Sequence, residues 1–142
     1  MINTIHAPQV YVKHTGTDKG RGAYAARGFK EGEVVEECPV IVLYKPFEDL
    51  APRIQTIVFN WGSLTMTEPS NALVLGYGAI DNHANPANML YKGVLENHSI
   101  QYIAAKDINK DEELTVNYND ANGQPYCDEE TWFEFHKIKR LD

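Results

Sequence analysis

The chain has 142 residues, 43% of them hydrophobic and 23% charged, which suits one soluble globular domain with a single core. Its net charge of −7 makes it a poor candidate for binding the phosphates of nucleic acid and a suitable partner for a basic polypeptide, although acidity also serves solubility alone. No apolar run approaches the ~20 residues of a membrane span, and the start lacks a secretory pattern. Cys38 and Cys127 stand far apart, which argues against a structural zinc site or a disulfide framework and favours a reducing compartment.

The first third of the chain predicts short strands joined by turns. Residues 9–13 alternate apolar and polar side chains, as a half-buried strand does, and residues 15–22 form a turn-rich loop. Residues 34–37 and 40–44 predict two further strands. Pro39 separates them, and a proline there predicts a break or a position at the edge of a sheet.

The middle of the chain predicts little regular structure. Residues 45–55 contain Pro46 and Pro52, so they allow at most one or two helical turns. Residues 57–61 predict a strand, and residues 62–71 are polar and turn-like.

An apolar run at residues 72–75 leads into the stretch from Gly76 to Asn88, which holds three asparagines and one histidine within seven positions. Asparagine favours turns because its amide bonds nearby backbone groups. Two interpretations stay open from these residues: a surface turn after a buried strand, or a loop whose amides and backbone recognise a polar small molecule.

The last part of the chain predicts three more strands, at residues 90–95, 99–105 and 114–118, and a short helix at residues 129–141. About eight short strands with little helix predict a mostly β fold built from small sheets.

The sequence contains no motif for a metal site or for a serine nucleophile. The five histidines show no metal-ligand spacing, and no serine stands in a nucleophile-elbow motif. The run from Trp132 to Phe135 has three aromatic residues in four positions, which suits either a cap on the core or an apolar lid over a ligand.

Four segments, taken in order, resemble the SET-domain lysine methyltransferases. Residues 19–25 (Lys-Gly-Arg-Gly-Ala-Tyr-Ala) look like the first glycine motif of that family, which residues 29–37 continue. Asn82-His83 with Asn88 looks like its asparagine–histidine loop, and residues 112–118 (Glu-Glu-Leu-Thr-Val-Asn-Tyr) look like its catalytic-tyrosine motif. The chain looks closest to the minimal viral and bacterial members.

The chain departs from the family pattern at a few positions. Ala84 and Asn85 stand where serine and cysteine usually follow the histidine, Pro86 is shifted away from Asn88, and Asn119 replaces a common glycine. The cysteine clusters of the zinc-binding flanking modules are absent from the sequence. These differences bear on substrate preference and on the lid more than on the methyl-donor site.

The resemblance implies a SET-domain fold of several small curved sheets with short helices and a knot-like C-terminal threading. It implies one domain over residues 1–142, with an N-terminal part (9–43), an insert (44–71), a C-terminal part (72–120) and an aromatic lid (121–142). We expect an intracellular protein, cytoplasmic in a bacterium or in the host nucleus for a virus.

The resemblance also implies a reaction and its residues. The methyl donor would be S-adenosyl-L-methionine, without a metal, and the acceptor would be a lysine ε-amine of a basic protein such as a histone tail. Neither nucleic acid nor membrane would be a direct partner, and a homodimer is compatible with the family. Tyr118 would be the catalytic residue. The donor would be held by Arg21, Gly22, Tyr77, Asn82, His83 and Trp132. The substrate channel would be lined by Tyr77, Tyr118 and Tyr126.

Two alternatives remain at this point. One is a catalytically silent SET-like module that binds the donor or a basic peptide. The other is a β-rich interaction domain without a small ligand, in which the asparagine-rich stretch is a mere turn.

Overall fold

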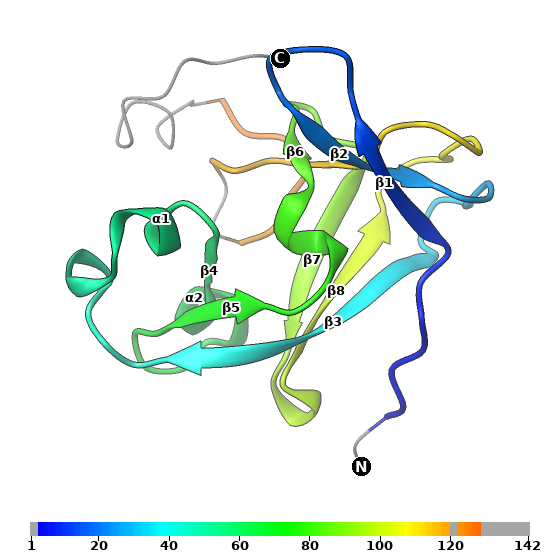
Figure 1. Ribbon diagram of the computed structural model, residues 1–142. Coiled ribbons are helices and arrows are strands. Elements are labelled where there is room, and N and C mark those ends of the chain that lie inside the picture. The colour runs from blue at the N-terminus through cyan, green and yellow to red at the C-terminus, as the bar shows by residue number, and fades with distance from the viewer. Residues whose placement is uncertain (1–2, 120–121, 129–142) are drawn as a thin grey trace.

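Short strands form three small sheets in the computed structural model, which describes residues 3–119 and 122–128 (Figure 1). The first sheet is an antiparallel hairpin of β1 (Val10–His14) and β2 (Arg21–Ala25). Its register pairs Val10 with Ala25. Every residue of β2 except Arg21 is buried. The strand predicted at residues 9–13 is confirmed.

The second sheet has five strands in the order β4-β5-β3-β8-β7. Its members are β3 (Val34–Leu43), β4 (Val58–Asn60), β5 (Asn71–Val74), β7 (Met89–Val94) and β8 (Ser99–Ala104). All neighbouring pairs are antiparallel. The mostly β class predicted from the sequence is therefore confirmed.

The break predicted at Pro39 is wrong, because β3 runs continuously through it in the centre of the sheet. The first half of β3 pairs with β8 up to the Pro39–Ser99 pair, and the second half pairs with β5 from Val40 onward. Pro39 lies where one partner strand replaces the other, so its missing N–H interrupts neither ladder.

The helical elements are single turns or little more. They are η1 (Phe47–Asp49), α1 (Pro52–Gln55), α2 (Trp61–Thr65), η2 (Tyr77–Ile80) and η3 (Leu95–Asn97). The first two confirm the one or two helical turns predicted within residues 45–55. No helix in the described part of the chain is long and apolar enough to cross a membrane.

Residues 61–65 form α2, where the sequence predicted the end of a strand at Trp61 and a polar turn from residue 62. The Asn60 side chain accepts a hydrogen bond from the backbone N–H of Ser63 (3.0 Å), which caps this helix, and its first residue, Trp61, is buried. A five-residue helix is too short to show a 3.6-residue period, so the pattern could not reveal it.

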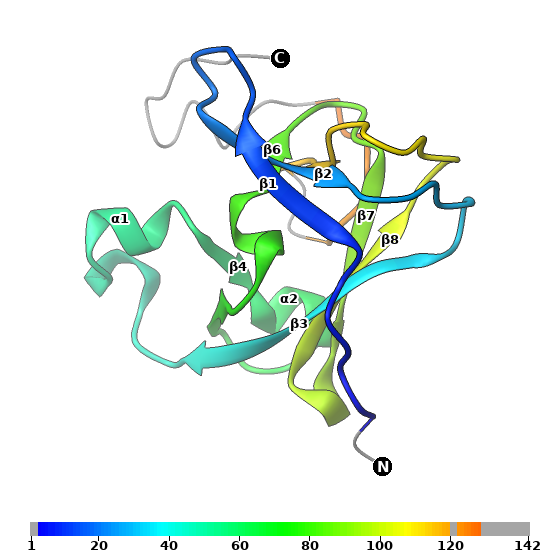
Figure 2. The ribbon, with the colours of Figure 1, turned by 45° about the vertical axis from the view of Figure 1, so that its right-hand side comes forward.

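The third sheet has only two short parallel strands, β6 (Asn82–His83) and β9 (Thr115–Val116). Two views place β6 beside the β1–β2 hairpin, on the side of the molecule away from α2 (Figure 1 and Figure 2). The core between the sheets contains fully buried Tyr102, Met89, Ile100 and Leu114. The helix predicted at residues 129–141 lies outside the described residues, and the knot-like threading stays a prediction.

Candidate active site

The pairing of β6 with β9 brings together residues that are 33 positions apart. Asn82 lies opposite Thr115, and His83 lies opposite Val116. The backbone N–H of Tyr118 donates to His83 Nδ1 (3.1 Å), and the Tyr118 hydroxyl donates to the carbonyl oxygen of Asp81 (2.6 Å). The Tyr118 ring therefore has a fixed position beside the asparagine–histidine loop.

Asn88 attaches the loop to the strand that carries Tyr118. Its side-chain Oδ1 accepts the backbone N–H of Thr115 (2.9 Å), and its Nδ2 donates to the carbonyl of Glu113 (2.8 Å). The Thr115 hydroxyl in turn accepts the backbone N–H of Asn88 (3.0 Å). These buried reciprocal bonds satisfy polar groups on both segments, so Asn88 has a structural role at the site.

Asn82 connects this loop to the hairpin. Its Nδ2 donates both to the carbonyl of Arg21 (3.0 Å) and to Glu113 Oε2 (2.7 Å). A Cβ on Gly22 would lie 2.6 Å from Glu113 Oε2, so a side chain there would displace the carboxylate that Asn82 contacts. Gly22, Asn82, His83 and Tyr118 thus meet in one place, together with the backbone of Arg21.

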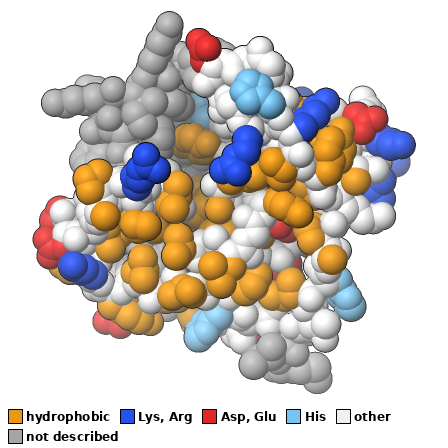
Figure 3. Space-filling view, in the orientation of Figure 1, with side chains coloured by type: hydrophobic (Ala, Val, Ile, Leu, Met, Phe, Trp, Pro, Cys, Tyr) orange, Lys and Arg blue, Asp and Glu red, His pale blue; other side chains and the backbone are white. Residues whose placement is uncertain are grey.

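A cavity of about 780 Å³ opens beside Tyr118. Its inner end is lined by Gly78, Ala79, Asp81 and Tyr118, and its outer wall comes from the insert (residues 44–71). Figure 3 shows hydrophobic side chains gathered over the insert and β5 on this face of the molecule. Exposed Tyr44 and Ile57 contribute to this apolar wall.

Burial sets the electrostatics at the inner end of the cavity. It raises the pKa of Tyr118 far above the usual value, and the nearby carboxyls of Asp81 and Glu113 raise it further. Burial likewise raises the pKa of Asp81, with contributions from Glu36 and Glu113. The Tyr118 phenol consequently stays neutral over the whole physiological pH range.

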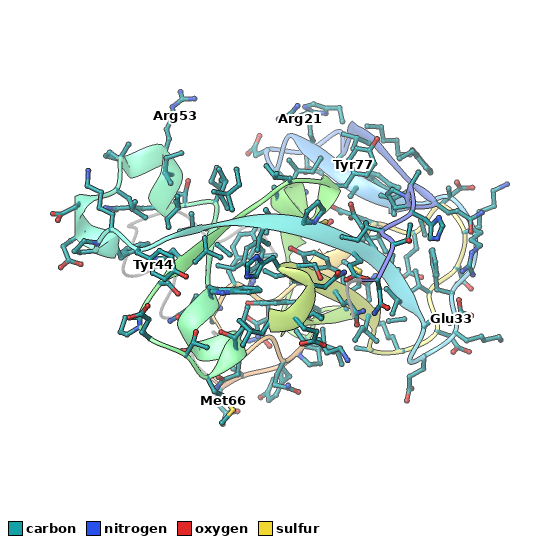
Figure 4. The ribbon with its side chains drawn as sticks, turned by 90° about the horizontal axis from the view of Figure 1, so that it is seen from below. Arg21, Glu33, Tyr44, Arg53, Met66 and Tyr77 are labelled. Atoms are coloured by element: carbon teal, nitrogen blue, oxygen red, sulfur yellow. The ribbon has the colours of Figure 1, made fainter. Side chains whose placement is uncertain are left out.

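Tyr77 does not line the cavity beside Tyr118. Tyr77 and Arg21 both line a different cavity, of about 510 Å³, and Figure 4 shows their side chains on the same side of the molecule, far from Tyr44 of the insert. The Tyr77 N–H donates to Glu36 Oε2 (2.9 Å), and its side chain is 40% exposed. The roles predicted for Tyr77 at the donor and in the channel stay predictions.

The two remaining predicted residues belong to the C-terminal part. Tyr126 is exposed, and its hydroxyl donates to Asp128 (2.8 Å). Trp132 lies outside the described residues. The lid predicted from these aromatic residues therefore stays a prediction.

Sequence reasoning missed three polar residues that shape the site. Glu113 accepts the Asn82 amide, Asp81 is buried at the inner end of the cavity, and Asn85 bonds Cys127 through both its Nδ2 and its Oδ1 (2.8 and 3.2 Å). Asn85 had been noted only as a departure from the family pattern. Its polar side chain within an asparagine-rich loop was the one available signal of a bonding role.

Comparison with known proteins agrees with this geometry. The family model described as the SET domain matches residues 20–119. A histone-lysine N-methyltransferase of Schizosaccharomyces pombe, specific for lysine 37 of histone H3, is 30% identical over 102 residues, which cover 72% of this chain and 68% of that protein.

Solved structures share the fold. A Plasmodium falciparum protein described as a histone methyltransferase superposes with a TM-score of 0.64 at 21% identity, covering 80% of this chain and 96% of the other. Chaetomium thermophilum polycomb repressive complex 2 bound to S-adenosylmethionine gives 0.60 at 24% identity, covering 82% of this chain but only 16% of the other. With the family model matching most of its length and the tyrosine set against the asparagine–histidine loop, the chain belongs to the SET-domain family of protein-lysine methyltransferases.

Proposed function

We propose that this protein transfers a methyl group from S-adenosyl-L-methionine to the ε-amine of a lysine in a basic protein or histone-like tail. The observation that carries the proposal is the Tyr118 hydroxyl, held 2.6 Å from the Asp81 carbonyl at the inner end of the 780 Å³ cavity and directly beside Asn82. A lysine side chain entering the cavity would reach the phenol from one side, and the donor would lie on the Asn82 side.

The polar groups around Asn82 suit the amino-acid portion of the donor. Both N–H groups of the Asn82 amide are used by Arg21 and Glu113, which leaves Oδ1 as the end that can accept from an ammonium group. The Lys19 ammonium lies 3.4 Å from the carbonyl of His83, where a carboxylate would find an opposite charge. We therefore assign donor binding to Arg21, Gly22, Asn82 and His83, with Lys19 added.

Tyr118 positions the acceptor amine. A phenol that donates its proton to a carbonyl can only accept from a third group, so its oxygen is suited to take an N–H of the amine. The donor supplies an activated methyl on a sulfonium. Holding nitrogen, carbon and sulfur in line can supply roughly 7–11 kcal/mol of the barrier, which makes positioning the main task of these residues.

The insert supplies the wall for a substrate peptide. β4 is the outermost strand of the five-stranded sheet, and its residues Val58, Phe59 and Asn60 line the cavity. An extended peptide can pair with such an edge and lower one side chain into the cavity. The net charge of −7 favours a basic peptide over an acidic one.

Mass spectrometry tests the proposal. The protein is incubated with S-adenosyl-L-methionine and purified core histones, and the products are searched for methylated lysines. We expect methyl groups on lysine only, and no transfer when the donor is replaced by its demethylated product. Donor binding in calorimetry without any methyl transfer would instead identify a silent donor-binding module. If the protein neither binds the donor nor transfers a methyl group, the proposed site is rejected.

A further inference from the structure

Asp81 is an unusual residue to find buried at the inner end of this cavity. It directly precedes Asn82, its carbonyl accepts the Tyr118 hydroxyl, and it lines the 780 Å³ cavity. Its side chain is 3% exposed, and neither carboxylate oxygen has a hydrogen-bond partner among the described residues. A buried carboxyl without a hydrogen-bond partner lowers the stability of the fold, so a functional role explains Asp81 better than a packing role does.

No cation among the described residues influences Asp81: Lys45 lines the same cavity but is not among the groups that shift the pKa of this carboxyl. The titratable groups that influence it or are influenced by it come from β3, β8 and both ends of β9: Glu36, Cys38, Tyr102, Glu113 and Tyr118. All of them are acids. Neither ion pair found among the described side chains includes Asp81. Within residues 3–119 and 122–128, then, no ion pair neutralises this carboxyl, and a bound ligand could supply the cation.

The substrate brings such a cation to this place. A free lysine has a pKa of about 10.4, so it arrives as an ammonium and must lose a proton before it can attack a methyl group. We propose that the Asp81 carboxylate contacts the substrate ε-ammonium in the cavity and takes this proton. The inference rests on the proposed function, since it assigns one further catalytic residue to the same site.

The proton transfer is balanced without any other reactant. One N–H bond of the ammonium breaks, its electron pair stays on nitrogen as the attacking lone pair, and an O–H bond forms on Asp81. The proton then leaves to water through the cavity mouth. Burial and the acidic neighbours favour the neutral carboxyl, which helps it to hold the proton, whereas an approaching cation favours the carboxylate that must receive it.

Three variants separate this role from a structural one. Asp81→Asn keeps the shape and removes the charge, and Asp81→Leu removes the acceptor as well. Asp49→Asn is the matched control, because Asp49 is an exposed carboxylate in the insert (residues 44–71) and does not line the cavity. Peptide binding to each variant is measured in the absence of the methyl donor. One synthetic peptide carries a single lysine flanked by arginines, and the other carries norleucine, which lacks the amine, in place of that lysine.

We expect D81N to shift the preference between the lysine and norleucine peptides toward norleucine by about tenfold, the loss of one hydrogen bond to a charged group. D49N should shift it less than about twofold. In turnover with donor, wild-type kcat should be level at neutral pH, whereas that of D81N should rise about tenfold per pH unit toward the pKa of free lysine. A defect that closes at high pH is not expected of a packing residue.

Thermal unfolding without donor provides an independent readout. The folded-state pKa of Asp81 lies above the unfolded value, so the protonated group stabilises the fold at low pH and this stability is lost as pH rises through the folded pKa. D81N and D81L should therefore unfold at higher temperature than wild type at pH 8, with no such gain near pH 4. Variants that are less stable at pH 8 would show a structural partner for Asp81 and overturn the inference.

The outcomes distinguish the two proposals. If wild type methylates lysine and D81N matches its pH profile and peptide preference, Asp81 is not the proton acceptor and only this inference fails. If wild type transfers no methyl group to any lysine, the proposed function itself fails.

Discussion

Asn82 shows how one side chain can serve both the fold and the site. Its two N–H groups join the loop to the hairpin through Arg21 and Glu113, and we assign its oxygen to the ammonium of the donor. Because the amide orientation is set by the two donated bonds, the acceptor is preorganised before any ligand arrives.

Replacing Asn82 with alanine should weaken donor binding by about tenfold, since one hydrogen bond to a charged group is lost. It should also lower the free energy of unfolding by about 1–2 kcal/mol, because Glu113 loses its donor. Calorimetry and thermal unfolding measure the two effects. Asn109→Ala, at an exposed turn position, is the control. Unchanged donor affinity in N82A would contradict the assignment.

Single residues were predictable where a motif marks them and not where folding buries them. Gly22, Asn82, His83 and Tyr118 were named through the family resemblance, and the structure brings them together. Asp81 stands in the same loop, yet in the sequence it is only a polar turn residue. Its burial at the cavity depends on contacts with distant strands, which no local pattern contains.

At the scale of elements, the C-terminal segment (residues 122–128) is held against the asparagine-rich loop. Asn85 bonds the backbone of Cys127 twice, and the N–H groups of Ala87 and Tyr91 donate to the carbonyls of Pro125 and Gly123. The asparagine that departs from the family pattern therefore fixes the start of the predicted lid.

Asn85→Ala should release this segment while leaving the sheets intact. The loss of two hydrogen bonds corresponds to about 1–3 kcal/mol of local stability. Hydrogen exchange should become faster at residues 122–128 and stay the same in β3 and β8, and donor affinity should fall several-fold. Equal exchange in N85A and wild type would show that the other contacts of the segment suffice to hold it.

Strand positions followed from alternation, but strand partners did not. The strands predicted at residues 90–95 and 99–105 correspond closely to β7 and β8. In contrast, the break or edge position predicted at Pro39 is wrong, because the sequence cannot show that β3 exchanges β8 for β5 at that point. The parallel pair β6–β9 was not predicted, since two-residue strands have no period.

For the whole molecule, the excess of acidic residues predicts how the substrate is attracted. The chain has 20 acidic and 13 basic residues, and long-range attraction between exposed charges is screened within about 8 Å at physiological ionic strength. The apolar contacts of the cavity and the buried Tyr118 are affected much less by salt.

Raising the salt concentration should therefore raise KM for a basic peptide several-fold and leave kcat nearly constant. Steady-state kinetics between about 10 and 300 mM sodium chloride measure both, spanning Debye lengths from about 30 Å to below 8 Å. A neutral peptide with the same central lysine is the control and should show little change in KM. A fall in kcat alone would indicate that salt acts on the fold instead.

The most direct measurement of the central claim compares donor binding with methyl transfer in Tyr118→Phe. The variant keeps the ring and removes the hydroxyl that lies 2.6 Å from the Asp81 carbonyl. We predict donor affinity within about threefold of wild type and a loss of about 100-fold or more in kcat for lysine methylation, as expected when one preorganised polar group is removed from a reacting centre. Near-normal methylation by a variant that still binds the donor would contradict the account.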